Sequence, residues 1–212
     1  RVGDDARDRV LGDLGRPEYF SWIASGDPRS SGSVHMCYEI ILQAYGFEKG
    51  WDLITRISAN VRSFGEAGGA APREVAAGEV AAGMVIDQYA QTVIDSVGDG
   101  LLVFVLPPKM TVIGPDAIAI LKGTRQKELA KLFVEYVLSP EGQRILFQPP
   151  GRNGQHYALH RMPIGEPMYD EQYAPRANPY STVPGFTYDA DLDNRRRKIV
   201  DDMIGVCMIE AH

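Results

Sequence analysis

The segment Ala70–Ala90, AAPREVAAGEVAAGMVIDQYA, constrains the fold more than any other stretch because its hydrophobic pattern changes once along its length. Pro72 suits the first turn of a helix, and apolar residues follow it at helical spacing. The run Met84–Ile86 then predicts a short buried strand. Asp87 and Tyr89 come directly after that strand, two residues apart in an extended stretch, so we expect them to face the same side. Ligands bind at the carboxyl ends of strands in open α/β sheets, so this segment predicts half of a binding site.

Hydrophobic spacing along the rest of the chain predicts further strands and helices in an α/β order. The predicted strands are Tyr19–Ser25, Val61–Phe64, Leu101–Leu106 and Ala117–Leu121. The predicted helices are Val34–Tyr45, which Gly46 ends, Glu48–Ser58, Gln126–Leu138 with Leu132 in its apolar stripe, a helix restarting at Ser139, and Asn194–His212. Residues 148–191 show little periodicity and are expected to wrap over the surface.

Composition excludes some classes of function and leaves the compartment open. The 28 acidic and 22 basic residues give a net charge of -6, which argues against nucleic acid as a partner. No apolar run approaches the roughly 20 residues that cross a bilayer. Cys37 and Cys207 each fall on the apolar stripe of a predicted helix, which favours buried thiols over a disulfide.

Several polar clusters have both a functional and a structural interpretation. The loop 27–33 could hold an anion or a polar ligand oxygen at a helix start, or Ser31 or Ser33 could simply cap the helix. The glycine-rich loop 65–71 opens another helix, where a flexible surface loop is the simpler interpretation. Asp116 follows Pro115, which favours a turn. His156 and His160 lie beside Gly and Pro and lack a third ligand, so no metal site or cofactor is predicted.

The ordered set of motifs resembles the extracellular solute-binding proteins of bacterial ABC importers, in the branch that includes ferric-ion binding proteins. These motifs are GDPRSSGS at 26–33, YGFEKGW at 45–51, GE at 78–79, IDQYA at 86–90, PDAIAILKG at 115–123 and LSPEGQ at 138–143. The resemblance implies a type 2 periplasmic binding fold, with two α/β lobes that close over a ligand. It also implies delivery of the ligand to a membrane permease, a periplasmic or other extracytoplasmic location, and no enzymatic activity.

The resemblance also implies where the ligand binds. Ser31, Gly32 and Ser33 match a polar or anion-holding turn, and Asp87 and Tyr89 match a strand end with ligand-contacting tyrosines; Asp116 is a further candidate. Iron binders of this branch have two adjacent tyrosines, whereas Ala90 follows Tyr89 here, which disfavours ferric iron. An organic anion, a phosphonate-like compound, a polyol or a small amine fits this turn and strand end.

The resemblance divides the chain at about residue 106. Residues 1–106 would form most of the second lobe, and residues 107–212 the returning part of the first lobe with the carboxy-terminal helices. The amino-terminal half of the first lobe is expected to be missing from this sequence. Two alternatives remain open: an α/β enzyme that uses Asp87 or Asp116 as an acid or base, and the effector-sensing domain of a transcription regulator.

Overall fold

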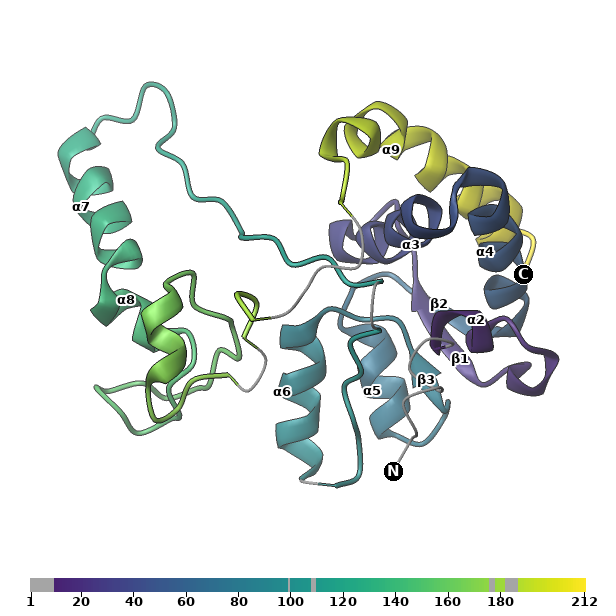
Figure 1. Ribbon diagram of the computed structural model, residues 1–212, viewed down its shortest axis with the longest axis horizontal. Coiled ribbons are helices and arrows are strands. Elements are labelled where there is room, and N and C mark those ends of the chain that lie inside the picture. The colour runs from purple at the N-terminus through teal and green to yellow at the C-terminus, as the bar shows by residue number, and fades with distance from the viewer. Residues whose placement is uncertain (1–9, 99, 108–109, 176–177, 182–186) are drawn as a thin grey trace. The chain divides into compact units, whose positions relative to one another are not determined.

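The computed structural model describes residues 10–98, 100–107, 110–175, 178–181 and 187–212. The chain divides into two compact units, residues 1–112 with 184–212 and residues 113–183. Figure 1 shows the elements of both units, which are described here one at a time.

The first unit is built on a parallel sheet in which three strands have the order β2-β1-β3. The central strand β1 (Ile23–Gly26) pairs in parallel with β2 (Val61–Gly65) and with the short β3 (Ala82–Gly83). A helix follows each of these strands, so the α/β class predicted from the hydrophobic pattern is confirmed. The predicted strand at 61–64 is also confirmed, whereas the strand predicted at 19–25 begins later because Tyr19 ends a short 3₁₀ helix.

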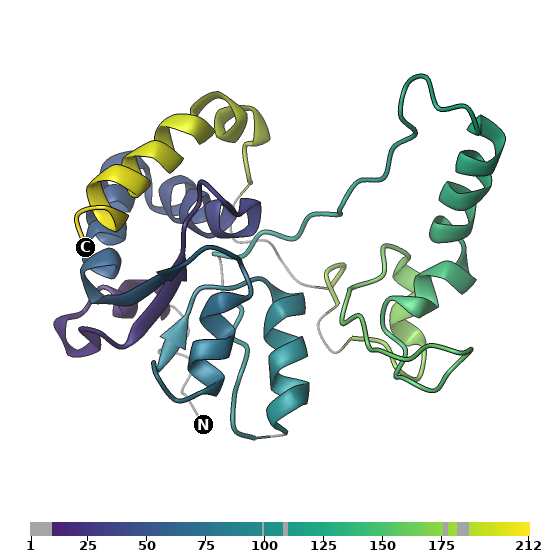
Figure 2. The same cartoon turned by 180° about the vertical axis from the view of Figure 1, so that it is seen from behind.

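Helices cover both faces of this sheet. Figures 1 and 2 show α5 and α6 on one side and α3, α4 and α9 on the other. The helical elements of the first unit are α2 (Val10–Leu14), η1 (Pro17–Tyr19), α3 (Gly32–Tyr45), α4 (Phe47–Asn60), α5 (Ala70–Ala76), α6 (Asp87–Val97), α9 (Ala190–Ile204) and the π-helical turn η3 (Gly205–Ile209). The helices predicted at 34–45 and 48–58 are therefore confirmed within a few residues.

Strand β1 contributes side chains to the core on both faces of the sheet, because successive side chains of a strand point to opposite faces. Ile23 is fully buried in the main core with residues of α3 and α4, whereas Ala24 packs with Ala71 and Val80 on the other face. The hydroxyl of Ser25 lies 2.7 Å from the Tyr38 hydroxyl of α3. A strand buried on both faces is typical of a parallel sheet, and all four residues of β1 are buried.

The carboxy-terminal helix α9 packs on α3 and belongs to the first unit. Val200 and Ile204 are buried in the main core, and Arg196 forms an ion pair with Glu39 at 2.7 Å. By these contacts α9 groups with the amino-terminal residues, whereas the division implied by the resemblance placed it with residues 107–212. The assignment of either unit to a lobe of a binding protein stays a prediction.

The second unit contains α7 (Lys127–Leu138), α8 (Pro140–Ile145) and the 3₁₀ helix η2 (Glu166–Asp170). Ser139 caps α8 by accepting a hydrogen bond from the Gly142 amide at 3.1 Å, as its sequence predicts. Gln143 is buried and joins α7 to the later loop: it donates to the Val137 carbonyl at 2.7 Å and accepts from the Ile164 amide at 2.8 Å.

Three predicted strands are wrong. Residues 101–106 and 117–121 are irregular, and Met84–Ile86 forms the connection between β3 and α6. Leu101 and Val103 are 74% and 82% exposed, and Leu121 is 80% exposed. A strand needs a neighbour for its backbone hydrogen bonds, and among the described residues no strand pairs with 101–106 or 117–121. At the third run the strand lies two residues earlier: β3 ends at Gly83, and the Met84 amide still donates to the Ala24 carbonyl at 3.4 Å.

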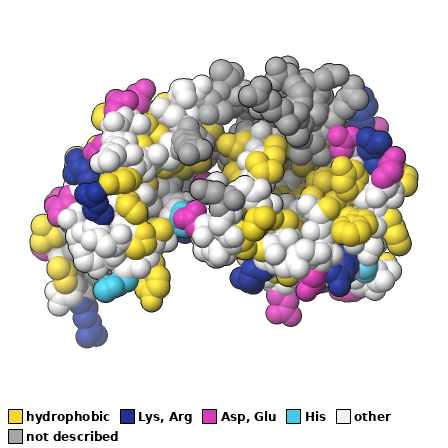
Figure 3. Space-filling view, turned by 90° about the horizontal axis from the view of Figure 1, so that it is seen from below, with side chains coloured by type: hydrophobic (Ala, Val, Ile, Leu, Met, Phe, Trp, Pro, Cys, Tyr) yellow, Lys and Arg dark blue, Asp and Glu magenta, His cyan; other side chains and the backbone are white. Residues whose placement is uncertain are grey.

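Two side chains predicted to be buried are exposed. Leu132, in the apolar stripe of α7, is 62% exposed, and Cys207 is exposed on η3. The reason is the same for both: no element in the described part of the chain covers that helical face. The space-filling view shows hydrophobic side chains at the surface (Figure 3). Both cysteines are free thiols, as predicted. Among the described helices, none is long and apolar enough to span a membrane.

Candidate ligand-binding site

Three loops meet at the carboxyl edge of the sheet, and each leads into the amino terminus of a helix. Residues 27–31 join β1 to α3, residues 66–69 join β2 to α5, and residues 84–86 join β3 to α6. The first amides of a helix have no partner within it, and the helix macrodipole is positive at that end. This edge of the sheet is therefore suited to a negatively charged group or a polar oxygen.

The first turn of α3 presents two hydroxyls and uncapped amides. Ser31 occupies the N-cap position, and its carbonyl accepts the first helical hydrogen bond from the His35 amide at 2.9 Å. Its hydroxyl makes no capping hydrogen bond and instead lies 3.0 Å from the Ser33 hydroxyl. Capping by the Ser31 side chain, the structural alternative for this loop, is thus not what the hydroxyl does here.

Gly68 brings the second loop against the first. A Cβ atom on Gly68 would overlap the hydroxyl of Ser33, and it would lie 3.2 Å from the hydroxyl of Ser31 and 3.1 Å from the ring of Tyr89. Only a residue without a side chain fits this position without displacing its neighbours. The glycine therefore allows residues from three separate loops to meet.

Backbone contacts fix the first two loops to each other. The Asp27 amide donates to the Gly65 carbonyl at 2.9 Å, and the Ser30 hydroxyl lies 2.6 Å from the Glu66 carbonyl and 3.0 Å from the Asp27 carbonyl. Arg29 closes the loop by an ion pair with Asp27 at 2.7 Å, and this guanidinium lowers the pKa of the Asp27 carboxyl. These contacts hold Ser31 and Ser33 in place.

The third loop supplies Asp87 and Tyr89, in a geometry that differs from the prediction. Both residues lie in the first turn of α6 and not in an extended stretch. At about 100° per residue, two positions apart on a helix point to opposite sides, so the predicted pairing on one side is wrong. Tyr89 faces Gly68 and Gly69, and one of its ring carbons lies 3.7 Å from where a Cβ on Gly69 would be. Asp87 occupies the first helical position.

The structure brings together Ser31, Gly32, Ser33 and Tyr89, as the sequence predicted, and leaves Asp116 elsewhere. Asp116 belongs to the second unit, where its carboxylate is 89% exposed and forms an ion pair with Arg161 at 2.5 Å. Its role in ligand binding stays a prediction, as do the roles of Asp87 and of the four residues that the structure brings together.

A buried polar network between α3 and α9 lies beside this edge. His35 is fully buried, and its two ring nitrogens lie 2.7 Å from Asp193 and 2.5 Å from Asp201. Burial raises the pKa of Asp193, but hydrogen bonds from Tyr188, Arg197 and His35 outweigh it and hold that pKa below its usual value. Burial dominates at Asp201 and raises its pKa.

Three groups of this network are close enough together to be tested as metal ligands: His35, Glu39 and Asp193 have ligand atoms within 4.8 Å of one another. However, Glu39 is already bound by the Arg196 guanidinium at 2.7 and 3.1 Å, and Asp193 by Arg197 at 2.8 Å. Two cations therefore occupy the positions that a metal ion would need, and the donor set does not fit one.

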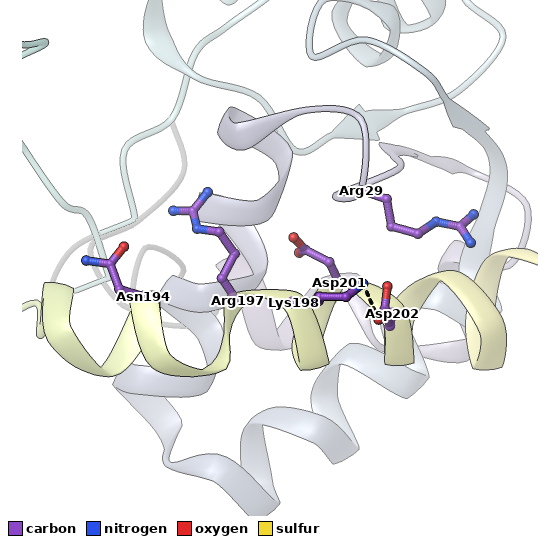
Figure 4. Close-up of a pocket in the computed structure, with 6 residues that line it drawn as sticks. All are labelled: Arg29, Asn194, Arg197, Lys198, Asp201 and Asp202. Carbon is purple, nitrogen blue, oxygen red and sulfur yellow. Dashed lines mark hydrogen bonds and ion pairs between the residues drawn. The ribbon is translucent and has the colours of Figure 1, made fainter.

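A hollow of about 400 Å³ beside α9 is lined by Arg29, Asn194, Arg197, Lys198, Asp201 and Asp202, whose side chains are drawn in Figure 4. Most of its charges are neutralised locally. Lys198 pairs with Asp202 at 2.9 Å, and Arg29 pairs with Asp27 and with Glu210 at 2.5 Å. These pairs neutralise Arg29 and Lys198, so the hollow is largely an ion-paired surface.

Sequence reasoning missed two features of the site. Loop 65–71 was interpreted as a flexible surface loop, yet Gly68 makes the closest approach in the site. Paired glycines between a strand and a helix were the available signal. The second feature is Arg197, whose Nη1 lies 3.9 Å from where a Cβ on Gly32 would be. Nothing local in the sequence indicates this proximity, because 165 residues separate the two positions.

A family model described as a bacterial extracellular solute-binding protein matches residues 1–148. The chain is 35% identical over 139 residues to the phosphoglycerate transport regulatory protein PgtC of Salmonella typhimurium. That alignment covers 63% of this chain and 33% of PgtC. An uncharacterised protein of Haemophilus influenzae is 28% identical over 137 residues, which cover 64% of this chain and 39% of that protein. The chain thus spans about a third of the length of these relatives.

Two solved structures share the fold. The periplasmic binding protein AfuA from Actinobacillus pleuropneumoniae, bound to exogenous fructose 6-phosphate, aligns with a TM-score of 0.63 at 21% identity. The alignment covers 99% of this chain and 65% of AfuA. The periplasmic binding protein P5PA aligns with a TM-score of 0.64 at 21% identity, over 97% of this chain and 64% of that one. The chain belongs to the family of bacterial extracellular solute-binding proteins and has an α/β periplasmic binding protein fold.

Proposed function

We propose that this chain binds a small anionic solute, one that carries a phosphate or a similar oxyanion, for an ABC import system. One observation carries the proposal: Ser31, Ser33, Gly68 and Tyr89 meet where three helices begin at the carboxyl edge of the sheet. Helix amino termini favour negative charge, whereas a cationic amine would meet the positive ends of three macrodipoles. The proposal therefore narrows the ligands open from the sequence to anions.

The relatives support this class of ligand. The names of PgtC and of the AfuA structure refer to phosphoglycerate transport and to bound fructose 6-phosphate, both phosphorylated solutes. Delivery to a membrane permease, a periplasmic location and the absence of catalysis belong to the same proposal. The described residues near the site provide hydroxyls and backbone donors, which suit binding without chemistry.

Calorimetry on the purified chain tests the proposal with matched ligands. The titrants are 3-phosphoglycerate and fructose 6-phosphate, each compared with its non-phosphorylated counterpart, glycerate or fructose. We expect at least one phosphoester to bind and its counterpart to bind much more weakly. Absence of phosphoester binding, or equal binding of the pair, contradicts the proposal.

The variant Ser33→Ala tests whether the phosphoester binds at this edge of the sheet. Ser33→Ala removes one hydroxyl donor to the anion, and a hydrogen bond to a charged group contributes about 1.5 to 3 kcal/mol, or roughly tenfold or more in affinity. Ser96→Ala, near the other end of α6, is the matched control. If both variants bind the phosphoester as tightly as the unsubstituted chain, the ligand binds elsewhere.

A second candidate function uses the same site for sensing. PgtC is named a regulatory protein, which favours a role in which ligand binding is reported to a partner and not followed by transport. The two roles differ in the partner of the ligand-bound form. Capture by a permease supports import, and capture by a receptor or regulator supports sensing.

A further inference from the structure

Helix α9 places a guanidinium group beside the first turn of α3. Arg197 Nη1 lies 3.9 Å from the position of a Cβ atom on Gly32, the residue between Ser31 and Ser33. Since Gly32 has no side chain, nothing of its own separates this cation from the turn. Figure 4 shows the guanidinium groups of Arg197 and Arg29 pointing away from each other.

The other edge of the same guanidinium is held firmly. Arg197 Nη2 donates to Asp193 at 2.8 Å, and Asp193 is buried, where it also contacts His35 at 2.7 Å and Tyr188 at 2.8 Å. Asp193 is thus shared among three partners. Its anchoring of Nη2 leaves Nη1 directed at Gly32.

Neighbouring cations of α9 are engaged elsewhere. Arg196 binds Glu39 through two of its nitrogens, and Lys198 binds Asp202 at 2.9 Å on the outer surface. Arg195, the fourth cation of α9, is exposed. Among the described residues of α9, Arg197 is the cation whose guanidinium approaches the α3 turn. A planar guanidinium with a free edge suits a phosphate oxygen.

We propose that Arg197 contacts the oxyanion of the ligand at the first turn of α3, so that the carboxy-terminal helix helps to select for negative charge. This inference rests on the proposed function of the site. A loss of about tenfold in affinity is expected when the cation is removed, as for other hydrogen bonds to charged groups.

The test uses the full chain, calorimetry, and inorganic phosphate together with the phosphoester that binds best. Arg197→Gln should weaken both ligands about tenfold, and Arg197→Lys should recover part of the loss because it keeps the charge. Lys198→Gln removes one positive charge from the next position of the same helix and should change affinity little. Equal losses in Arg197→Gln and Lys198→Gln overturn the inference, because a general electrostatic effect would explain them.

Two further measurements distinguish direct contact of Arg197 with the ligand from a purely structural role. The denaturation midpoint shows whether Arg197→Gln loosens α9. The pH profile of phosphoester binding, taken across the second phosphate ionisation at about pH 6, shows whether the preference for the dianion is lost. A shifted midpoint with an unchanged pH profile overturns the inference. If Ser33→Ala weakens binding and Arg197→Gln does not, the inference fails while the proposed function stands.

Discussion

His35 Nε2 lies 2.7 Å from Asp193 Oδ1, and this contact joins α3 to α9 across 158 residues of sequence. Both residues are buried, and the second ring nitrogen of His35 contacts Asp201 on the same helix. The position of the carboxy-terminal helix therefore depends on a small polar network, whose contribution to stability can be measured.

The stability of the chain should fall in acid because of Asp193. Its pKa is lowered in the folded state, so its contribution is fully present above the unfolded pKa of about 3.9 and is lost as the pH falls through the folded pKa. Asp201 has a raised pKa and the opposite sign, so it offsets part of the loss at the start of the titration. We expect the free energy of unfolding, measured by denaturant at a series of pH values, to decrease below about pH 4.

Asp193→Asn should reduce stability at neutral pH and flatten this acid dependence, because the ionised partner of His35 and Arg197 is gone. Asp191→Asn, at an exposed position of the same helix, serves as the control and should follow the unsubstituted chain. An acid profile that is unchanged in Asp193→Asn would show that other carboxylates control it.

Gly68→Ala should abolish or strongly weaken phosphoester binding, because its Cβ would overlap the Ser33 hydroxyl and press on the Tyr89 ring. Gly114→Ala is the matched control, since a Cβ there meets nothing within 4 Å. Calorimetric titration of both variants gives the comparison. Normal affinity in Gly68→Ala would mean that the ligand does not use the space where the three loops meet.

Leu132→Ala should change the free energy of unfolding by no more than about 0.5 kcal/mol, because the side chain is 62% exposed. Its apolar neighbours along α7 predict the opposite from sequence. Ile54→Ala, at a fully buried position of α4, should cost about 2 to 5 kcal/mol. Denaturation followed by circular dichroism compares the two. A large loss in Leu132→Ala would show that something covers α7 in solution.

Thiol labelling should modify one cysteine of the folded chain before the other. Cys207 is exposed, whereas burial raises the pKa of Cys37 to about 11, which leaves little of the reactive thiolate. Intact mass after brief alkylation should show one adduct, and peptide mapping should place it on Cys207. Rapid labelling of both thiols would mean that Cys37 on α3 is accessible to the reagent in the folded chain.

The sequence predicted local elements well wherever their stabilising partners are also local. Helix α3 and the cap of α8 depend on nearby residues such as Gly46 and Ser139, and both are confirmed. The strands predicted at 101–106 and 117–121 need neighbours that hydrophobic patterns cannot specify, and both are wrong. In the site, Ser31 and Ser33 were visible as a polar turn before a helix. The approach of Arg197 to Gly32 was not, because it depends on how α9 packs on α3.

The hydroxyl of Ser30, which contacts backbone carbonyls of two different loops, has a consequence for how tightly a solute can be held. Loops that are already joined lose little conformational entropy when a ligand arrives, so more of each contact appears as affinity. Differences in affinity among solutes should then come mainly from their dissociation rates, because a preformed site binds them at similar association rates.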